Sequence, residues 1–507
     1  MEGDADSKLL SHQDDTVSAK ATTQSPSVNQ HPFATARLSR SQFNYSFPVT
    51  TGPKFVRLFF YPTSYPSFPR TDASFTVLSN QFILLHAFNA SLNADAESTQ
   101  TIFKEYVVNV DTGDRLNLSF IPSQPNSYAF INGIEVLSMP TDLYYTSADD
   151  VGLTFVGRTI LYRVESSTAL ETEYRIKVGG QAISPVNDTG LFRNWAGQDQ
   201  DYLLTNNTQN NDLPADLGNG NITVKPDYVA PKEVYRTARS MGSNHTLNHI
   251  SNLTWEFLID TGFTYMIRLH FCELDPNITN IGDRVFWIYI ASQVAEDHAD
   301  VMKWSQKQHG LAVQRNYAVL IPNNNNQKKV NLSLQMHSYN NSRDSIYNDA
   351  FLNGVEIFKI SNSSSSLAGS NPVPPQTPQN NVPIQKGESS SQTGTTIGIV
   401  VGVVFGVVLI SFVVFMVVFL RRKRAAATKP KYYNSKSTTP HNYSLPSHLC
   451  RHFSLIDIKA ASNNFDDVLI IGVGGFGHVY KGYIDGCLTP VAIKRLKPDS
   501  GRGHMSS

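Results

Sequence analysis

A glycine-rich segment near the C-terminus has the residue types and the spacing of a phosphate-binding loop. Gly472, Gly474, Gly477 and Val479 follow the pattern G-x-G-x-x-G-x-V, and V-A-I-K follows at Val491–Lys494. Glycines let a β-hairpin backbone come close to the phosphates of a nucleotide, and a lysine on the next strand supplies a positive charge for them. The two motifs therefore predict a nucleotide site built on neighbouring strands.

The glycine pattern alone would also fit a dinucleotide-binding fold, or a hairpin beside an unrelated strand. The first alternative needs a helix directly after the third glycine, whereas HVYKGYI at His478–Ile484 has the pattern of a strand and a turn. Together the motifs are typical of the start of a protein kinase domain, with Val479 and Ala492 against the adenine. The predicted ATP-binding residues are Ile471, Gly472, Val473, Gly474, Gly475, Phe476, Gly477, Val479, Ala492 and Lys494.

Phosphoryl transfer needs more than this loop. It also requires a glutamate that pairs with the lysine, a catalytic aspartate and an aspartate that holds Mg²⁺. The sequence after Lys494 runs only to Ser507 and contains none of their motifs. We therefore expect residues 453–507 to be partly disordered and catalytically inactive, with no catalytic residue and no metal site. ATP with Mg²⁺ is the cofactor expected of a complete relative.

One long apolar run divides the chain. Ile397–Leu420 contains no charged residue, and as a helix its 24 residues would reach roughly 36 Å, enough for a hydrocarbon layer of about 30 Å. A buried strand or helix of a soluble core is the alternative, but core strands are seldom this long. Arg421–Arg424 follow at once, which predicts a cytoplasmic C-terminal side. We expect a single-pass plasma membrane protein whose N-terminal part is extracellular.

The composition agrees with this orientation. Lys and Arg together number 42, as do Asp and Glu, so no overall charge favours nucleic acid as a partner. Only 17% of the residues are charged, and many asparagines lie in Asn-x-Ser/Thr sequons. The predicted glycosylation sites before the apolar run are Asn44, Asn89, Asn117, Asn187, Asn206, Asn221, Asn244, Asn252, Asn277, Asn331, Asn340 and Asn362.

Cysteine provides little covalent support for the extracellular part. Of the 3 cysteines only Cys272 precedes the apolar run, so no disulfide can form within that part. A buried free thiol is the simpler interpretation of Cys272, and an intermolecular disulfide is the alternative. The extracellular part must then be stabilised by its own hydrophobic cores.

The extracellular part has the pattern of an all-β protein. Short apolar runs such as Phe55–Tyr61 and Leu116–Ile121 are separated by Pro, Gly, Asn and Asp, and several alternate with a period of two. No long amphipathic helix is predicted before the apolar run. These features favour antiparallel β-sandwiches.

Three short motifs occur twice, in the same order. The pairs are Thr35–Arg37 with Thr237–Arg239, Val56–Phe60 with Ile267–Phe271, and Ala129–Val136 (AFINGIEV) with Ala350–Ile357 (AFLNGVEI). They predict two homologous β domains in tandem, because the repeat is far longer than that of a solenoid. The Asn-Gly dipeptide in each copy predicts a tight hairpin turn.

The second copy extends further toward the N-terminus than the first, because the strand-like YRIKVGG at Tyr174–Gly180 has no counterpart before Val56. MEGDADSKLL also lacks the apolar run of a signal peptide, so either Ile397–Leu420 acts as its own insertion signal or the start of the chain is missing. We expect the signal peptide and the opening strands of the first domain to be missing from this chain. The expected parts are a first β domain at 1–165, a second at 172–360, a flexible extracellular stalk at 361–396, the membrane helix at 397–420, a basic juxtamembrane segment at 421–452 that contacts anionic lipid, and the kinase start at 453–507.

Further motifs connect these parts to a known family. They are SPVNDTGLFRNW at Ser184–Trp195, IRLHFCEL at Ile267–Leu274 and RHFSLIDIKAASNNFDD at Arg451–Asp467. With the repeated motif and the glycine loop, they resemble the plant malectin-like receptor-like kinases of the Catharanthus type, close to the FERONIA group, over nearly the whole chain. The missing signal peptide, opening strands and most of the kinase are departures, so the chain resembles a family member truncated at both ends.

The resemblance implies an all-β ectodomain of two tandem malectin-like β-sandwiches, one transmembrane helix and the first strands of a protein kinase N-lobe. It also implies a cell-surface Ser/Thr kinase that senses cell-wall carbohydrate or secreted peptides together with a membrane-anchored co-receptor.

Two other functions fit the same sequence. The chain could be a kinase-less receptor or decoy that binds ligand without signalling alone. It could also be a carbohydrate-binding, lectin-like membrane protein. Its candidate sugar-stacking residues are Tyr61, Tyr65, Phe68 and Trp195, although aromatic side chains of a β-sandwich more often belong to the core.

Overall fold

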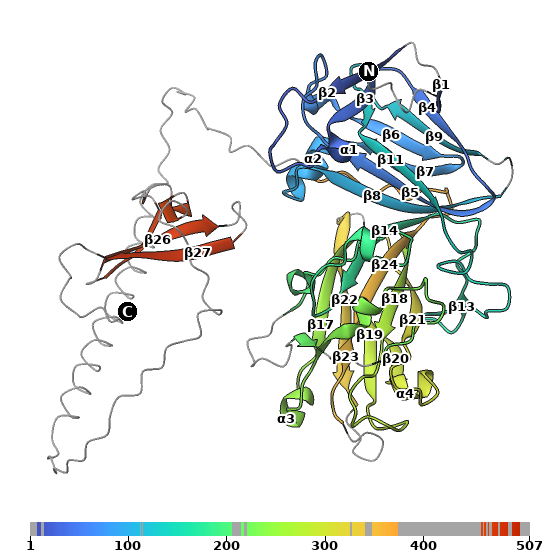
Figure 1. Ribbon diagram of the computed structural model, residues 1–507, viewed down its shortest axis with the longest axis vertical. Coiled ribbons are helices and arrows are strands. Elements are labelled where there is room, and N and C mark those ends of the chain that lie inside the picture. The colour runs from blue at the N-terminus through green and yellow to red at the C-terminus, as the bar shows by residue number, and fades with distance from the viewer. Residues whose placement is uncertain are drawn as a thin grey trace, which may run out of the picture. The chain divides into compact units, whose positions relative to one another are not determined.

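The protein is described by a computed structural model with two compact units, Met1–Asn380 and Asn381–Ser507 (Figure 1). The structure describes residues 8–11, 15–111, 113, 115–204, 214–216, 221–324, 327–339, 347–373, 458–459, 461–462, 465, 469–474, 477–484 and 489–496. Among these, no helix is long and apolar enough to cross a membrane. The predicted membrane segment 397–420 and the juxtamembrane segment 421–452 lie outside the described residues, so both stay predictions.

The first unit is built of β-strands, as its sequence predicts. We call β1–β11 with their loops the first module. Its elements are β1 (Leu10–Ser11), β2 (Thr16–Lys20), α1 (Gln30–Phe33), β3 (Thr35–Ser39), β4 (Phe43–Pro48), β5 (Gly52–Phe60), β6 (Phe75–Ser79), β7 (Phe82–Phe88), α2 (Ala90–Ala96), β8 (Ile102–Val110), β9 (Arg115–Pro122), β10 (Ala129–Ile131) and β11 (Gly133–Ser138).

We call β12–β24 the second module. Its elements are β12 (Leu153–Phe155), β13 (Leu161–Tyr162), β14 (Leu170–Lys177), β15 (Pro214–Asp216), β16 (Thr237–Ser240), α3 (His245–Asn248), β17 (Leu253–Asp260), β18 (Thr264–Phe271), β19 (Phe286–Ile290), β20 (Gln293–Ala299), α4 (Val301–Trp304), β21 (Val313–Leu320), β22 (Lys329–Ser338), β23 (Phe351–Leu352) and β24 (Gly354–Ile360). The longest α-helix in the described part of this unit, α2, has only 7 residues, which confirms the expectation of no long helix.

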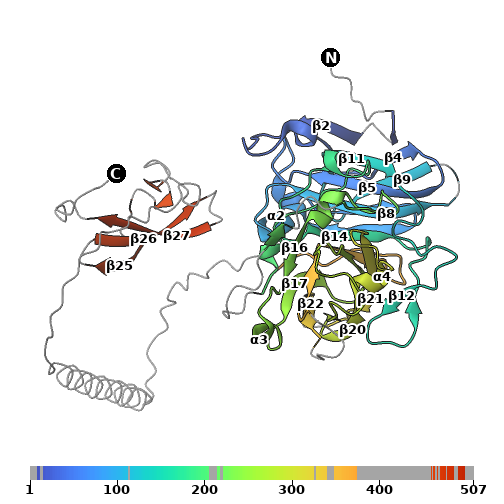
Figure 2. The same cartoon turned by 60° about the horizontal axis from the view of Figure 1, so that its bottom comes forward.

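The two modules share one sheet, which a tandem repeat does not by itself predict. Nine strands follow the order β11-β5-β8-β14-β24-β18-β21-β12-β13. At the junction β14 pairs with β24 along its length and with β8 through Leu170–Val107 and Glu171–Tyr106. Figures 1 and 2 show β8 and β14 side by side there. The sheet does not break near residue 165, and β12 and β13 pair within the second module although they precede that residue.

Smaller sheets cover this shared sheet and enclose the cores. The first module contributes the sheet β1-β4-β9-β6-β7, and the second contributes β17-β22-β19-β20. The predicted alternation is confirmed in β9, where Leu116, Leu118 and Phe120 are buried and the residues between them are not. The side chains on one face thus fill the core, as in a half-buried antiparallel sheet.

The Asn-Gly dipeptides mark a change of sheet, and the predicted tight hairpin turn is wrong. β10 pairs with β3, whereas β11, directly after Asn132, pairs with β5 in the shared sheet. In the second module β23 pairs with β16, and β24, after Asn353, pairs with β14 and β18. At each asparagine one continuous stretch of chain passes from one layer to the other.

Asn353 explains why the three motifs of a repeat occur together. Its Nδ2 donates to the carbonyl oxygens of Thr237 at 2.9 Å and Tyr235 at 3.2 Å, and its Oδ1 accepts from the backbone N–H of Cys272 at 2.8 Å. Asn353 is fully buried. One side chain of the third motif therefore satisfies backbone groups within or next to the other two motifs, and these groups would be costly to bury unpaired.

Asn132 has the same role in the first module. Its Nδ2 donates to the Thr35 carbonyl at 2.9 Å, and its Oδ1 accepts from the Tyr61 backbone N–H at 2.7 Å. The following glycine is required by close packing, because a Cβ on Gly133 would lie 2.7 Å from Pro32 Cβ. The repeated motifs thus specify the corner at which the chain changes sheet.

The segment that we expected to begin a flexible stalk packs on the first module as far as Asn371. The backbone N–H of Leu367 donates to the Ile83 carbonyl at 2.9 Å, and the Asn371 side chain donates to the Ala87 carbonyl at 2.7 Å. Leu367 is fully buried in the core of the first module. Apolar burial and backbone pairing therefore hold 361–371, which composition alone did not indicate.

A row of buried charges crosses the boundary between the modules. Arg57 on β5 pairs with Glu105 on β8 at 2.7 Å, and Glu105 pairs with Arg175 on β14 at 2.8 Å. Arg175 then pairs with Glu356 on β24 at 2.7 Å. Each of these four residues is at most 6% exposed. The signs alternate across adjacent strands, so each buried charge has an opposite neighbour.

Burial raises the pKa values of the buried carboxylates, whereas pairing with cations lowers them. Burial alone would raise the pKa of Glu356, but Arg175 and His270 lower it well below its ordinary value. Burial would likewise raise the pKa of Glu171, which Lys104 and Lys359 lower to about 2. Burial lowers the pKa of His270 despite the contact with Glu356. The folded state therefore favours ionised carboxylates and a neutral imidazole.

We expect Glu356→Gln to reduce the free energy of unfolding by about 3–5 kcal/mol, because it removes one buried partner of Arg175. Chemical denaturation of the purified chain, followed by intrinsic fluorescence, measures the change. Glu135 is the matched control, because it holds the corresponding place beside Arg57 but its side chain is 57% exposed. Glu135→Gln should cost less than about 1 kcal/mol. Equal losses in the two variants would contradict a dominant role for the buried row.

Stability should fall as the pH is lowered from 7. Carboxylates with a depressed native pKa stabilise the fold above their unfolded pKa of about 4.5, and this contribution is lost as the pH falls toward about 2. The lowered pKa of His270 also reduces stability as the pH falls below about 6.5, because the unfolded state then gains a proton that the folded state does not bind. Denaturation midpoints at pH 7, 5 and 3 should decrease in that order. An increase between pH 5 and pH 3 would show that other groups dominate.

Candidate functional site

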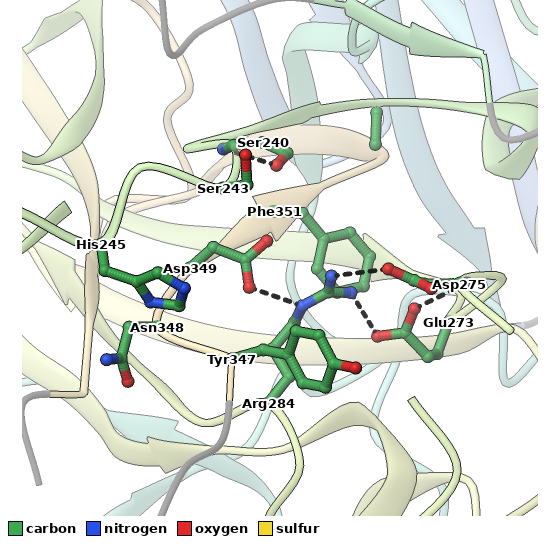
Figure 3. Close-up of a pocket in the computed structure, with 12 residues that line it drawn as sticks. Ser240, Ser243, His245, Glu273, Asp275, Arg284, Tyr347, Asn348, Asp349 and Phe351 are labelled. Atoms are coloured by element: carbon green, nitrogen blue, oxygen red, sulfur yellow. Dashed lines mark hydrogen bonds and ion pairs between the residues drawn. The ribbon is translucent and has the colours of Figure 1, made fainter. Parts of the chain in front are cut away.

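The second module contains a pocket of about 350 Å³ (Figure 3). Glu273 and Asp275 enter it from the segment after β18, Arg284 from the segment before β19, and Asp349 from the residue pair before β23. β16 and α3 contribute the remaining walls. The pocket therefore lies where the chain passes between layers, beside the corner made by Asn353.

Local structure places each acidic side chain. The backbone N–H of Asp275 donates to Glu273 Oε1 at 3.0 Å, and Asp275 Oδ1 accepts from the backbone N–H of Asn277 at 3.0 Å. These short-range bonds are those of Asx-type turns. Asp349 is held in place because Phe351, two residues later, anchors β23 in the core.

Arg284 lies at the centre of the pocket and is paired on three sides. Its Nη1 lies 2.6 Å from Glu273 Oε2, its Nε 2.8 Å from Asp349 Oδ1 and its Nη2 3.5 Å from Asp275 Oδ2. Its guanidinium also lies 5.1 Å from the Phe351 ring centre. Figure 3 shows the carboxylates converging on it. Arg284 is thus a fixed structural cation.

The charges of this group are set by burial and pairing. Burial raises the pKa of Glu273 above its ordinary value, although Arg284 opposes the shift. Burial alone would lower the pKa of Arg284, but Asp349 and Glu273 raise it overall, so that Arg284 stays charged. Three carboxylates face one guanidinium, which leaves an excess of hydrogen-bond acceptors in the pocket.

The pocket suits a ligand that donates hydrogen bonds. Asn348 lines it, and the buried Oδ1 of Asn348 has no hydrogen-bond partner. Ammonium, guanidinium and hydroxyl groups are the donors that acidic acceptors of this kind bind. In the part of the chain that the structure describes, no group of three or more His, Cys, Asp or Glu side chains could hold a metal ion.

At two positions aligned by the repeat, the first module lacks the acidic residues of this pocket. The repeated motifs align Glu273 with Pro62 and Asp349 with Tyr128. Tyr128 is fully buried, and its ring packs at 5.0 Å on Phe68. Sequence reasoning missed the pocket, but the replacement of apolar residues by acidic ones between the two copies was a signal that could have located it.

The prediction that four aromatic residues could stack on a sugar is wrong, because all four are buried. Tyr61, Tyr65, Phe68 and Trp195 are only 5%, 2%, 8% and 0% exposed. Their rings belong to the cores and none presents a face to solvent for stacking on a sugar. The prediction for Cys272 is confirmed, because it is a fully buried free cysteine and burial raises the pKa of its thiol to about 12.

The predicted glycosylation sites lie outside the cores wherever the structure describes them. Asn206 and Asn340 lie outside the described residues, and Asn44 and Asn89 are half-buried. The exposed sites are Asn117, Asn187, Asn221, Asn244, Asn252, Asn277, Asn331 and Asn362. Their use remains a prediction.

The second unit contains the predicted nucleotide segment as a three-stranded antiparallel sheet of β25 (Ile470–Gly474), β26 (Gly477–Ile484) and β27 (Thr489–Leu496). Val479 pairs with Gly472 on one side and with Lys494 on the other, so the backbone register brings both motifs together. Ile471 and Val473 also lie on β25, and Ala492 pairs with Lys481. Gly475 and Phe476 lie outside the described residues. The expected hairpin is present, and ATP binding stays a prediction.

Comparison with known proteins connects both units to one family. The malectin-like domain family matches residues 5–360. The chain is 44% identical to the receptor-like protein kinase FERONIA of Arabidopsis thaliana over 530 residues, which cover 99% of this chain and 58% of that protein. It is 34% identical to the receptor-like protein kinase ANXUR2 of the same plant, over 96% of this chain and 58% of ANXUR2. The chain thus spans somewhat more than half the length of these relatives.

Solved structures of similar proteins share the fold. A crystal structure of the plant receptor-like kinase FER is 45% identical, with a TM-score of 0.66 over 73% of this chain and 94% of that one. Another, with a TM-score of 0.65 and the same identity and coverage, contains FER in complex with the plant peptide RALF23 and LLG2. The ANX1 ectodomain of Arabidopsis thaliana is 34% identical, with a TM-score of 0.67 over 73% of this chain and 94% of that one.

We expect Arg284→Met to reduce the free energy of unfolding by about 3 kcal/mol, because Glu273 would keep a buried charge without its partner. Chemical denaturation measures the loss. The double variant Arg284→Met/Glu273→Gln should recover part of the stability, since the buried charge is then removed. A double variant less stable than Arg284→Met would argue against this pairing.

Proposed function

Because the chain belongs to the family of malectin-like receptor-like kinases, we propose that it is a cell-surface receptor whose first unit binds a secreted peptide outside the cell. The observation that carries the proposal is the 45% identity to the FER ectodomain, which has been crystallised with the peptide RALF23 and with LLG2. By analogy, a second, membrane-anchored protein would act as co-receptor for this chain.

The acidic pocket supports a peptide ligand with a basic residue. Glu273, Asp275 and Asp349 outnumber the single cation Arg284, and the Asp275 side chain is 33% exposed at the opening. A lysine or arginine of a peptide would complete this arrangement. A cell-wall polysaccharide is the second ligand class, because the unpartnered Asn348 oxygen would accept a sugar hydroxyl as well.

We propose a single-pass type I arrangement in the plasma membrane, with Ile397–Leu420 as the membrane helix beside the lipid-binding basic segment. The exposure of the described glycosylation sites supports an extracellular first unit. Residues 453–507 of the second unit would lie in the cytoplasm as the start of a Ser/Thr kinase domain. There the β25–β26 hairpin and Lys494 would bind ATP with Mg²⁺.

A binding experiment tests the receptor function. The full chain, displayed on cells with and without an LLG-type protein, is titrated with fluorescent RALF-type peptides. We expect saturable binding that strengthens when the second protein is present. Asp275→Asn should weaken binding roughly three- to tenfold, because it removes one charge at the opening of the pocket.

Asp297→Asn is the matched control, because Asp297 has a 61% exposed side chain and does not line the pocket. It should bind the peptide as the unaltered chain does. If the folded chain on the cell surface binds no such peptide, whether the LLG-type protein is present or absent, the proposed receptor function is wrong. Equal weakening by both substitutions would instead place the peptide outside this pocket.

A further inference from the structure

Among the residues that the structure describes, a buried arginine of the second module forms no ion pair. Arg268 lies on β18 and is only 4% exposed, and its Nη1 has no hydrogen-bond partner. It lines a cavity of about 200 Å³, separate from the pocket around Arg284. A buried charge or donor without a partner is costly, so an arrangement of this kind points to a missing partner.

In the first module the arginine at the corresponding position is paired with carboxylates. Arg57 on β5 corresponds to Arg268 in the repeated motif, and it pairs across the sheet with Glu105 and Glu135. Its Nε lies 2.7 Å from Glu105 and its Nη1 lies 3.4 Å from Glu135. Arg57 thus has a carboxylate on each neighbouring strand.

In the second module an asparagine replaces one of these carboxylates, and the other carboxylate pairs with different residues. The strand register places Asn316 and Glu356 on the two sides of Arg268. Asn316 is neutral, and its Oδ1 accepts from Arg268 Nε at 2.8 Å. Glu356 pairs instead with Arg175 at 2.7 Å and His270 at 3.1 Å.

The remaining contact of Arg268 does not neutralise it. Its guanidinium lies 5.0 Å from the ring centre of Tyr144, a weak cation–π contact. Within the described residues no carboxylate forms an ion pair with Arg268, although Asp142 and Asp150 line the same cavity. Both aspartates are exposed, and Asp142 accepts a hydrogen bond from the Tyr228 hydroxyl at 2.8 Å.

We propose that this cavity binds the carboxylate of a small extracellular ligand on the Nη side of the Arg268 guanidinium, where Nη1 has no partner, while Asn316 keeps its hydrogen bond to Nε. A guanidinium recognises a carboxylate through paired N–H donors, and burial strengthens the interaction. The ligand should carry one negative charge, because Asp142 and Asp150 would repel a second one, and hydroxyl or amino donors for those aspartates. An acidic sugar and an acidic peptide side chain both provide this chemistry.

The site is independent of the proposed peptide pocket, because the two cavities share no lining residue. Its test therefore succeeds or fails separately from the receptor function. It also differs from a general anion site, because Asp142 and Asp150 line the cavity together with Arg268.

Calorimetric titration of the purified full chain in carboxylate-free buffer tests the site with two matched pairs of probes. Glucuronate is compared with glucose, and N-acetylglutamate amide is compared with N-acetylglutamine amide. We expect at least one acidic probe to bind and its neutral counterpart to bind at least tenfold more weakly. Which acidic probe binds distinguishes a sugar source from a peptide source. No binding of either acidic probe to the folded chain overturns the proposal.

Two variants locate the binding. Arg268→Gln should weaken binding of the acidic probe at least tenfold. Asn316→Glu supplies in the chain the carboxylate that Glu105 provides in the first module, so it should abolish binding while the thermal midpoint stays the same or rises. The second variant keeps the test decisive even if Arg268→Gln does not fold.

Arg158→Gln is the control, since it removes an exposed positive charge outside the cavity and should leave binding unchanged. Binding to Asn316→Glu with unaltered affinity would overturn the proposal. Equal weakening by Arg158→Gln would do so as well, because the effect would then reflect overall charge.

Discussion

The architecture of the first unit depends on four buried charges that alternate in sign across neighbouring strands. Arg57, Glu105, Arg175 and Glu356 come from β5, β8, β14 and β24, and the boundary between the modules passes between the second and the third. Apolar packing alone would tolerate several registers of one strand on the next. A charge that is buried among opposite charges tolerates far fewer, because a shift leaves it unpaired at a cost of several kcal/mol.

This constraint explains why the two modules form one body. β14 pairs with β24 and with β8, so a single strand belongs to both repeats. The chain then returns after β24 and places Leu367 in the core of the first module. Lys359 reinforces this return, since its Nζ contacts both Glu171 and the Leu367 carbonyl. The two modules are therefore joined in two places, by the pairing of β14 with β8 and by the packing of the segment after β24 on the first module.

The repeats share a skeleton but differ where chemistry is possible. Both use an asparagine to pass the chain between sheets, and both place an arginine at the same position of a central strand. In the first module Arg57 is fully paired and Tyr128 fills the region beside the corner. In the second module Asn316 leaves Arg268 without a carboxylate, and Asp349 helps to open an acidic pocket. Divergence has thus concentrated the unsatisfied polar groups in the second module.

The relatives give these differences a functional setting. The chain shares its fold with ectodomains of plant receptor-like kinases, and one of those has been crystallised with a peptide. A receptor needs a rigid frame that holds its ligand contacts in place. The shared sheet is such a frame, and two cavities of the second module differ in charge, one lined by three carboxylates and one by a buried arginine.

The sequence by itself determined what depends on near neighbours along the chain. Period-two alternation placed strands such as β9, the repeated motifs revealed the tandem modules, and the spacing of glycines and lysine indicated the β25–β27 hairpin sheet. Only the tertiary structure decided what depends on residues far apart in the chain. Asn132 and Asn353 are sheet crossings and not hairpin turns because their partners lie on distant strands. Arg268 lacks a carboxylate because a strand some fifty residues away presents Asn316, and local sequence carries no record of that pairing.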